Sequence, residues 1–364
     1  MTGLRELLAR GAEAALENQR DDGSLPPGRN GPYGDAETPV RNTGHWLVSF
    51  CALQRWSGEQ RYQDAALAAA RYLAGEKSRP GGASFHHRAR GVKDASNGLI
   101  GQAWSIEALA EAAECFDAPQ LSELAEQVFL LHPFDSNTGL WRSVELDGSP
   151  GSWDVTFNHQ LWFAAAGTRL APLASREVAA RVQRFLDRLQ RNLALQDSGR
   201  VRHLVSPAAF LRAQPRLALR LWRTRRREGP EQAHKEAGYH AFNLYALASL
   251  RRHAPDHPFW RQPVFERLWR YARSEGHRRA TERNRFAWPY NPIGIEMAFA
   301  LETLEGPGAR SEAENWLAEQ LQRHWDPDAA ALCRDTVDPR TLSARLYEAV
   351  RLPDLDVPES ALPR

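Results

Sequence analysis

The sequence predicts an all-α protein with an (α/α)6-toroid fold, in which six helical hairpins form an inner and an outer ring of helices. Three observations lead to this prediction. Apolar residues recur at helical spacing along almost the whole chain, the helical segments follow one another in pairs, and five of them begin with similar polar and aromatic residues. Units of two helices, repeated at roughly 50 to 85 residues, are typical of helical arrays.

Twelve helices are expected along the 364 residues. They span residues 2–19, 42–56, 60–75, 97–114, 118–131, 156–170, 175–194, 240–252, 258–274, 292–304, 310–324 and 338–350. Runs that alternate with a period of two residues are short, so strands should be few and small. Short segments after three of the helices, such as FDSNTGLWRSV (134–144) and LQDSGRVRHLV (195–205), form a second, weaker repeat.

One helix of each of five pairs opens with a shared signature that contains an Asn close to the helix start. The segments are RNTGHWLVSF (41–50), KDASNGLIGQAW (93–104), SWDVTFNHQLWF (152–163), AGYHAFNLYAL (237–247) and WPYNPIGIEMAF (288–299). Their partner helices carry charges on one face, which is typical of outer helices. An open superhelix of helix pairs is the alternative fold. We favour the toroid because a shared central cavity needs polar aromatic residues at the starts of its inner helices.

Composition excludes several classes of protein. The chain is 42% hydrophobic and 25% charged, with 12 Trp and a net charge of +2, which excludes disorder. No stretch reaches the roughly 18 apolar residues of a membrane span, and the first helix lacks a signal-type apolar core. We therefore expect a cytoplasmic protein.

The same residues predict neither a metal nor a cofactor. The three cysteines, Cys51, Cys115 and Cys333, are too widely spaced for a zinc site or a disulfide framework. There is no HExxH motif, no P-loop and no GxGxxG motif after a strand, so metal, nucleotide and nucleic acid are not expected.

Residues 195–238 interrupt the rhythm of helix pairs, and we interpret them as a basic insertion within one domain that spans 1–364. The window 206–227 contains no acidic residue. Its seven arginines are Arg212, Arg216, Arg220, Arg223, Arg225, Arg226 and Arg227. Pro207 and Pro215 restrict any helix to the later half of the window. The window either packs on the toroid with solvated arginines, or covers the cavity mouth or contacts a polyanion or the inner face of an anionic membrane.

Two carboxylates are the first candidates for catalysis. Asp94 and Asp154 precede successive inner helices, so in a toroid both would face the same cavity. A carboxylate at a helix start also caps the helix, and this structural role stays open for each of them. Trp104, Trp153 and His159 lie close by in sequence. Because glycoside chemistry commonly uses two carboxylates, we interpret Asp94 and Asp154 as an acid/base pair.

Histidines and aromatic residues complete the expected site. His45, His159 and His240 each fall within one turn of an inner-helix start, and His87 lies in the loop before Asp94. An imidazole can move a proton or bind a sugar carboxylate, although a buried structural role is equally open. The other expected substrate-binding residues are Arg41, Trp104, Trp153, Asn158, Trp288 and Tyr290. Aromatic rings can stack on sugars, and core packing is the alternative for each of them.

These residues resemble a family of toroid enzymes. WSGEQRYQDAALAAARYL (56–73) is similar to a helix pair shared by unsaturated glucuronyl hydrolases and their rhamnogalacturonyl relatives. DVTFNHQLWFA (154–164) resembles their D-x-x-x-N-x-x-L-x-[FW]-A pattern, and GQAW (101–104) resembles another of their helices. The resemblance implies a toroid fold and makes Asp154 the catalytic acid/base, with Asn158 beside it. The chain also resembles toroid proteins of prokaryotic surface-glycan assembly loci.

The chain departs from the family in two places. GQAW follows the Asp motif in those hydrolases but precedes Asp154 here. Their second carboxylate opens an earlier inner helix, where this chain reads NTGHW (42–46) without an acid. Asp94 would replace it from a different hairpin.

Three functions follow as hypotheses. The first is a metal-independent glycoside hydrolase of uronate-containing oligosaccharides, in which Asp154 protonates an unsaturated uronate and activates water, while Arg41, His159 and His240 hold the carboxylate. The second is a sugar epimerase, isomerase or lyase that uses the cavity histidines. The third is a non-catalytic glycan-binding or assembly protein held at a membrane surface by 206–227.

Overall fold

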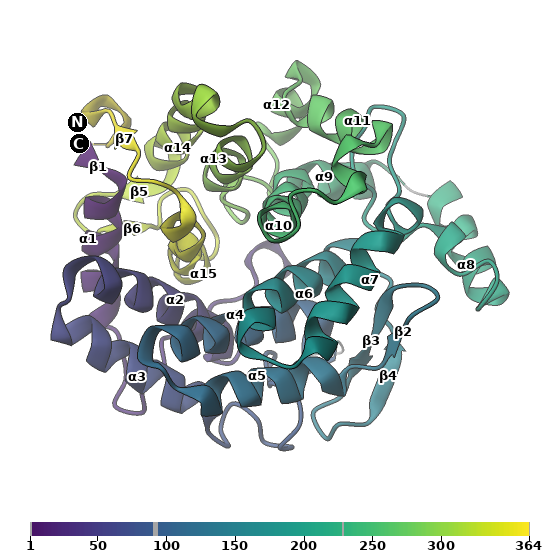
Figure 1. Cartoon of the computed structure of the whole chain (residues 1–364). Helices are drawn as coiled ribbons and strands as arrows, with labels where there is room; N and C mark the ends of the chain where they lie inside the picture. Colours follow the sequence, from purple (N-terminus) through teal and green to yellow (C-terminus); the bar gives the residue numbers. More distant parts are fainter. Residues whose placement is uncertain (1, 90–93, 228, 364) are drawn as a thin grey trace.

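The computed structural model describes residues 2–89, 94–227 and 229–363, and these residues contain fifteen α-helices. The architecture confirms the predicted (α/α)6 toroid (Figure 1). Lys93, at the start of one predicted segment, lies outside the described residues.

Six helical segments form the inner ring. They are α2 (Val40–Ser57), α4 (Gly98–Phe116), α6 (Phe157–Leu170), α10 (His240–His253), α13 (Ile293–Leu304) and α15 (Pro339–Ala344), which continues as the 3-10 helix η6 (Arg345–Arg351). Each packs against the next, and η6 packs against α2, so the ring closes. Inner helices are buried on nearly all sides: in α4, every residue from Gly98 to Ala113 is buried.

The outer ring surrounds these helices. It consists of α1 (Leu4–Leu16), α3 (Gln60–Ala74), α5 (Pro119–Leu131), α7 (Arg176–Asn192), α11 (Pro263–Ala272) and α14 (Arg310–His324). Outer helices bury one stripe only. In α7 the buried side chains Val178, Val182, Phe185 and Leu189 recur every three or four residues, as the amphipathic pattern predicts.

Short strands join helices and the two ends of the chain. β1 (Thr2–Gly3) pairs antiparallel with β7 (Asp356–Val357), so the first and last turns of the ring are joined (Figure 1). A three-stranded antiparallel sheet follows α5. Its strands are β2 (Phe134–Asp135), β3 (Leu140–Val144) and β4 (Pro150–Trp153), and a second small pair is formed by β5 (Trp325–Asp326) and β6 (Ala331–Leu332).

The structure differs from the predicted helices at two places. The predicted helix 258–274 is broken into η4 (Pro258–Arg261) and α11, because Pro263 cannot donate a backbone hydrogen bond, and α12 (Glu275–Thr281) follows. The last predicted helix, 338–350, is α-helical only to Ala344 and then tightens into η6.

Residues 195–238 contain η3 (Pro207–Ala209), α8 (Pro215–Arg226) and α9 (Pro230–Gly238). The helix in the later half begins at Pro215, a residue that is well tolerated in the first turn. No helix among the described residues is long and apolar enough to cross a membrane.

A buried ion cluster ties η6 to α13. The Arg345 guanidinium donates to Glu296 Oε1 at 2.7 Å, to Glu348 Oε1 at 2.7 Å and to Asn291 Oδ1 at 2.6 Å. Burial raises the pKa of Glu348 to about 7 even though Arg345 opposes the shift, and it raises the pKa of Glu296 as well. Burial therefore disfavours charge on both glutamates, and Arg345 opposes this effect at the contact between η6 and α13.

Replacing Arg345 with Met should destabilise the protein by about 3–5 kcal/mol, because it leaves buried carboxylates without their cation. The measurement is the free energy of unfolding in urea at pH 7. The matched control is Arg270→Met, which breaks the exposed Arg270–Glu266 pair and should change that free energy by less than about 1 kcal/mol. Equal losses in the two variants would contradict a stabilising role for Arg345.

Candidate site in the central cavity

A cavity of about 200 Å³ lies at the end of the ring where α4, α6 and α10 begin. It is lined by Asn30, Tyr33, Arg41, Arg88, Asn97, Ile100, Trp104, Thr156, Asn158, His159, His203, Lys235, Tyr239, Phe242, Tyr290, Asn291 and Arg345. None of these lining residues is Asp or Glu, whereas four are Arg or Lys. The positive ends of the inner helices also point toward this mouth, so the cavity favours a ligand that is negatively charged or rich in oxygen.

Arg41 is the most deeply buried cation of the cavity. Its Nη1 donates to Asn30 Oδ1 at 3.1 Å and to Glu37 Oε1 at 3.2 Å, and its guanidinium lies over the Trp104 ring at 4.2 Å. Burial alone would lower the pKa of Arg41, but Glu37 reverses this and raises it, so Arg41 stays charged. Its Nε and Nη2 are buried and have no hydrogen-bond partner among the described residues.

Asp154 orients His159. The Nδ1 atom of His159 lies 2.8 Å from Asp154 Oδ2, and the Asp154 carboxylate also accepts from Thr156 N at 3.1 Å and Leu99 N at 3.2 Å. Burial opposes ionisation, but His159 and these N–H donors hold the pKa of Asp154 below its usual value. An ionised Asp154 fixes the proton of His159 on Nδ1, which leaves Nε2 as the atom for chemistry in the cavity.

The two predicted carboxylates meet at the first turn of α4. Asp94 Oδ1 accepts from Gly98 N at 2.7 Å, next to the Leu99 N–H that Asp154 binds. Gly98 has φ +55°, and a Cβ there would lie 2.7 Å from Asp154 Oδ2, so only glycine allows this approach. Both carboxylates thus cap α4, and neither lines the cavity.

His203 is a cavity residue that the sequence did not indicate as functional. Two hydrogen bonds fix its backbone. Phe157 N donates to His203 O at 2.8 Å, and His203 N donates to Glu236 Oε1 at 3.1 Å. Burial and the nearby charge of Lys235 hold the pKa of His203 well below its usual value, so the ring is neutral at pH 7. The only sequence signal was its place in the repeated segment 195–205.

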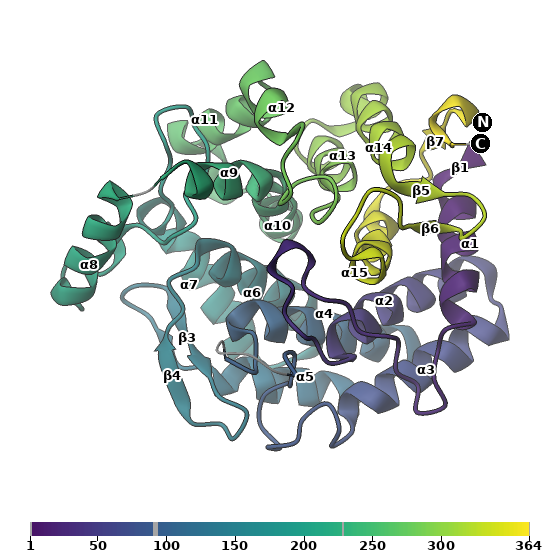
Figure 2. The same cartoon turned by 180° about the vertical axis from the view of Figure 1, so that it is seen from behind.

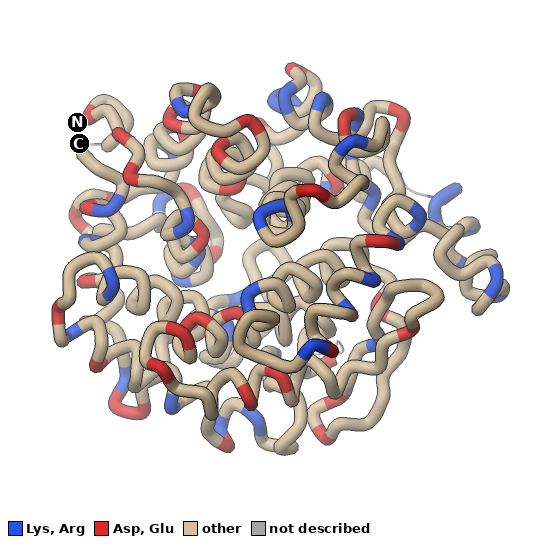
Figure 3. The backbone as a smooth tube through the Cα atoms, viewed as in Figure 1, with Lys and Arg blue, Asp and Glu red and all other residues tan. Residues whose placement is uncertain are grey.

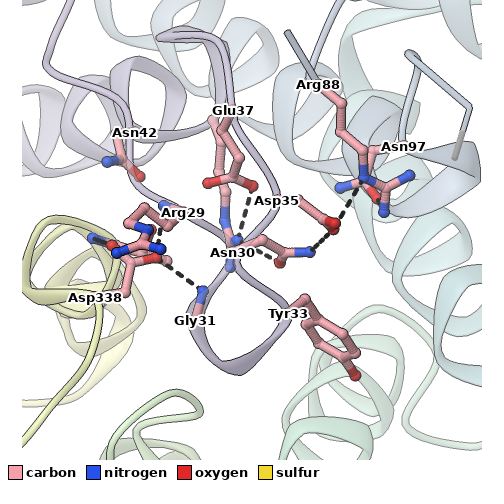
Figure 4. Close-up of polar contacts among 12 residues, drawn as sticks. Arg29, Asn30, Gly31, Tyr33, Asp35, Glu37, Asn42, Arg88, Asn97 and Asp338 are labelled. Carbon is pink, nitrogen blue, oxygen red and sulfur yellow. Dashed lines mark hydrogen bonds and ion pairs between the residues drawn. The ribbon is translucent and has the colours of Figure 1, made fainter. Parts of the chain in front are cut away.

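A strap, which we define as residues 29–37, crosses the centre of the ring at the cavity mouth (Figure 2). Its near end is held by Asp338, whose Oδ2 accepts from Arg29 N and Gly31 N, both at 2.8 Å (Figure 4). The middle is held by Asn30, whose Oδ1 accepts from Tyr290 Oη at 2.7 Å.

The far end of the strap reaches the opposite wall. Tyr33 Oη lies 2.9 Å from Tyr239 Oη, directly before α10. Asp35 lies 3.4 Å from Arg88 Nε, and Arg88 also binds Asn97 at the start of α4 (Figure 4). The strap is therefore anchored on three sides, and Tyr33 forms part of the cavity wall.

Five of the predicted binding residues line the cavity. They are Arg41, Trp104, Asn158, His159 and Tyr290. Asn158 Oδ1 is buried and has no hydrogen-bond partner among the described residues.

The other predicted histidines lie behind the wall. His45 is buried between Tyr347, 4.2 Å away in a stacked arrangement, and Trp104. His87 Nε2 lies 3.1 Å from Ser105 Oγ. His240 uses both ring nitrogens on backbone groups, Val201 N at 3.3 Å and Leu268 O at 3.1 Å. Burial lowers the pKa of all three rings, so they are neutral packing residues.

Two predicted tryptophans also lie outside the cavity lining. Trp153 packs edge-on against Phe210 at 5.2 Å between ring centres. Trp288 stacks on Trp316 at 5.7 Å, in contact with the outer helix α14. For these two residues the structure shows core packing.

The fold and its central cavity define a toroid of the type found in sugar epimerases and sugar hydrolases. D-mannose isomerase (13% identity, TM-score 0.65, 96% of this chain and 97% of that chain) has this fold. Cellobiose 2-epimerase from Bacillus thermoamylovorans shares it, with 12% identity and a TM-score of 0.64 over 95% of this chain and 98% of that chain. A heparin-specific unsaturated glucuronyl hydrolase also shares it, with 13% identity and a TM-score of 0.62 over 96% of each chain. At these identities the likeness concerns the fold alone.

A sequence relative gives the family. The chain is 44% identical to archaeal glycosylation protein Q of Haloferax volcanii over 369 aligned residues, which cover 98% of this chain and 99% of that protein. The chain therefore belongs to the family of archaeal glycosylation protein Q. No family model matches the sequence.

Replacing Asp154 with Asn should lower the free energy of unfolding at pH 7 by about 1.5–3 kcal/mol, because it removes a buried charged acceptor. Since the folded-state pKa of Asp154 is depressed, its contribution is present above the unfolded-state pKa and is lost as the pH falls through the folded-state value. The difference between wild type and variant, measured by urea unfolding from pH 7 to pH 3, should therefore shrink with acidity. The exposed control Asp256→Asn should show neither effect.

Proposed function

We propose that this protein is a sugar isomerase or epimerase, which moves a proton at the carbon next to the carbonyl of an open-chain sugar. The observation that carries the proposal is the cavity lining, which contains two histidines and several cations but no carboxylate among the described residues. The sugar epimerase and isomerase folds and the glycosylation relative support a sugar as substrate.

His203 is the proposed base. Its ring is neutral at pH 7, so it can accept the proton from the carbon next to the carbonyl, and the electron pair of that C–H bond then forms an enediolate. Arg41 stabilises the negative charge on the enediolate oxygens. Returning the proton to the neighbouring carbon gives the isomer, and returning it to the other face of the same carbon gives the epimer.

His159 is the proposed partner of His203. Because Asp154 fixes the proton on Nδ1, Nε2 can take a hydroxyl proton of the sugar and deliver it to the neighbouring oxygen. Asp154 is then a positioning residue. Thr156 pairs with Leu204, so His159 and His203 stand on neighbouring segments of one wall.

Hydrolysis is a second candidate. In its favour, Asp154 is buried directly behind the cavity residue His159, close enough to serve an unsaturated uronate if the side chains rearrange. Against it, both oxygens of Asp154 are engaged, and most glycoside hydrolases present two carboxylates to the bond they cleave.

The test of the proton transfer is exchange with solvent. Candidate aldoses, ketoses and uronates are incubated with the protein in D₂O, and deuterium incorporation next to the carbonyl is followed by NMR. His203→Gln should reduce the exchange at least about 100-fold and His159→Gln at least about 10-fold, because each removes an acid/base group. The control is His253→Gln, an exposed histidine at the other end of α10, which should keep wild-type exchange.

Two outcomes would refute the assignment. One is a His203→Gln variant that still converts the sugar and incorporates deuterium at the wild-type rate. The other is loss of the double-bond absorbance of unsaturated uronate disaccharides without any exchange, which would establish the hydrolase instead.

The cations of the cavity support a sugar that carries a carboxylate. Lys235 lies 5.2 Å from the Tyr33 ring and 5.8 Å from the Tyr239 ring, at the covered edge of the cavity. Arg41, Arg88 and Arg345 are the other cations of the lining. These donors suit a uronate better than a neutral hexose.

Lys235→Gln should raise KM for a uronate at least about fivefold and leave KM for the matching neutral hexose within about twofold, because only the uronate loses an ion pair. Steady-state kinetics with the two sugars measures this. The control is Lys77→Gln, an exposed lysine whose ion pair with Asp22 lies outside the cavity. An equal rise for both sugars would indicate a structural effect of the substitution.

A further inference from the structure

The helix α8 differs from every other helix in how little of it packs on the ring. It stands out from the rim of the toroid in both views (Figure 1, Figure 2). Its inner side rests on η3, where Ala218 and Leu221 are buried. The rest of the helix faces solvent, and no other described segment covers it.

The exposed face combines arginines with large apolar side chains. Arg216, Arg220, Arg223 and Arg227 lie on one stripe with Leu219, at helical spacing. Figure 3 shows Lys and Arg positions in blue on the projecting helix. Leu219 is 47% exposed, Trp222 is 44% exposed, and Leu211, just before the helix, is 63% exposed. These are three of the five exposed large hydrophobic residues in the described chain.

Among the described residues, no carboxylate pairs with the four arginines of this stripe. Some exposed arginines of other elements pair with acids, as in Arg273–Glu312 and Arg285–Glu231. No ion pair joins Arg216, Arg220, Arg223 or Arg227 to any described residue, and residues 206–227 contain no Asp or Glu. Arg226 lies 3.6 Å from the centre of the Trp222 ring, which keeps that ring at the surface beside a cation.

We propose that α8 is a docking surface for a membrane that carries anionic lipids. Arginines would contact lipid phosphates, while Leu211, Leu219 and Trp222 would insert at the level of the headgroups, where Trp is favoured. A soluble polyanion such as a nucleic acid would use the charges but has no need of exposed leucines. The combination of both side-chain types on one face therefore favours a lipid surface.

The helix also has the correct size for a peripheral contact. Its 12 residues span about 18 Å, too short to cross a bilayer but enough to lie along its surface. Because α8 projects from the rim, the toroid would attach by its edge and keep the strap and cavity outside the lipid. This docking is independent of the reaction in the cavity.

The test is flotation of the full-length protein with vesicles of phosphatidylcholine alone or with 40% phosphatidylglycerol. The wild type should bind only the anionic vesicles. The variant R216Q/R220Q/R223Q/R227Q should bind them at least about tenfold more weakly, since each arginine near an anionic surface contributes to binding. The matched control R20Q/R261Q/R279Q/R340Q removes four exposed arginines from other elements and should bind as the wild type does.

A second variant tests the apolar part. L219S/W222S should float less with anionic vesicles at 0.5 M salt, where electrostatic attraction is screened. Circular dichroism checks that each variant is folded. The proposal is overturned if the wild type does not float with anionic vesicles, if both arginine variants lose binding equally, or if the protein binds heparin or RNA but no vesicle.

Discussion

Closure of the ring is the constraint on which the rest of the structure depends. Once η6 packs against α2 and β1 pairs with β7, the starts of the inner helices lie around one mouth, and their positive ends point into it. The buried contact of Arg345 with Glu296 and Glu348 joins η6 to α13, the preceding inner helix. A cavity built in this way is electropositive before any side chain is added, and the four cations of its lining reinforce the same sign.

The acids of the site act from behind the cavity wall. Glu37 holds Arg41, Asp35 holds Arg88, and Asp154 holds His159, and none of these three acids lines the cavity. These contacts fix the positions of Arg41, Arg88 and His159, although the cavity lining itself contains no carboxylate. The arrangement explains how residues that look like an acid/base pair in sequence, Asp94 and Asp154, can serve the site without facing it, since both are engaged at the first turn of α4.

The sequence predicted the fold better than the site, and helix geometry explains why. Whether a helix buries one stripe of side chains depends on its local sequence. The spacing of apolar residues therefore located almost every helix. Facing the cavity depends on position within the helix. The third residues of α4, α6 and α10, namely Ile100, His159 and Phe242, all line the cavity. His240 is the first residue of α10, two positions and roughly 200° away, and therefore points behind the wall. His203 was missed because it reaches the cavity from an irregular segment, through pairing with the start of α6 that no periodic pattern predicts.

The strap and the small volume of the cavity restrict what can enter it. A space of about 200 Å³ is of the order of one sugar ring, and Tyr33, held by its contact with Tyr239, forms part of its wall. The strap depends on left-handed backbone at Asn30 and at its neighbour Gly31, and on contacts with Asp338, Tyr239 and Arg88, which come from three distant parts of the chain. A single sugar, or the terminal unit of a longer glycan admitted by displacement of Tyr33, fits this enclosure.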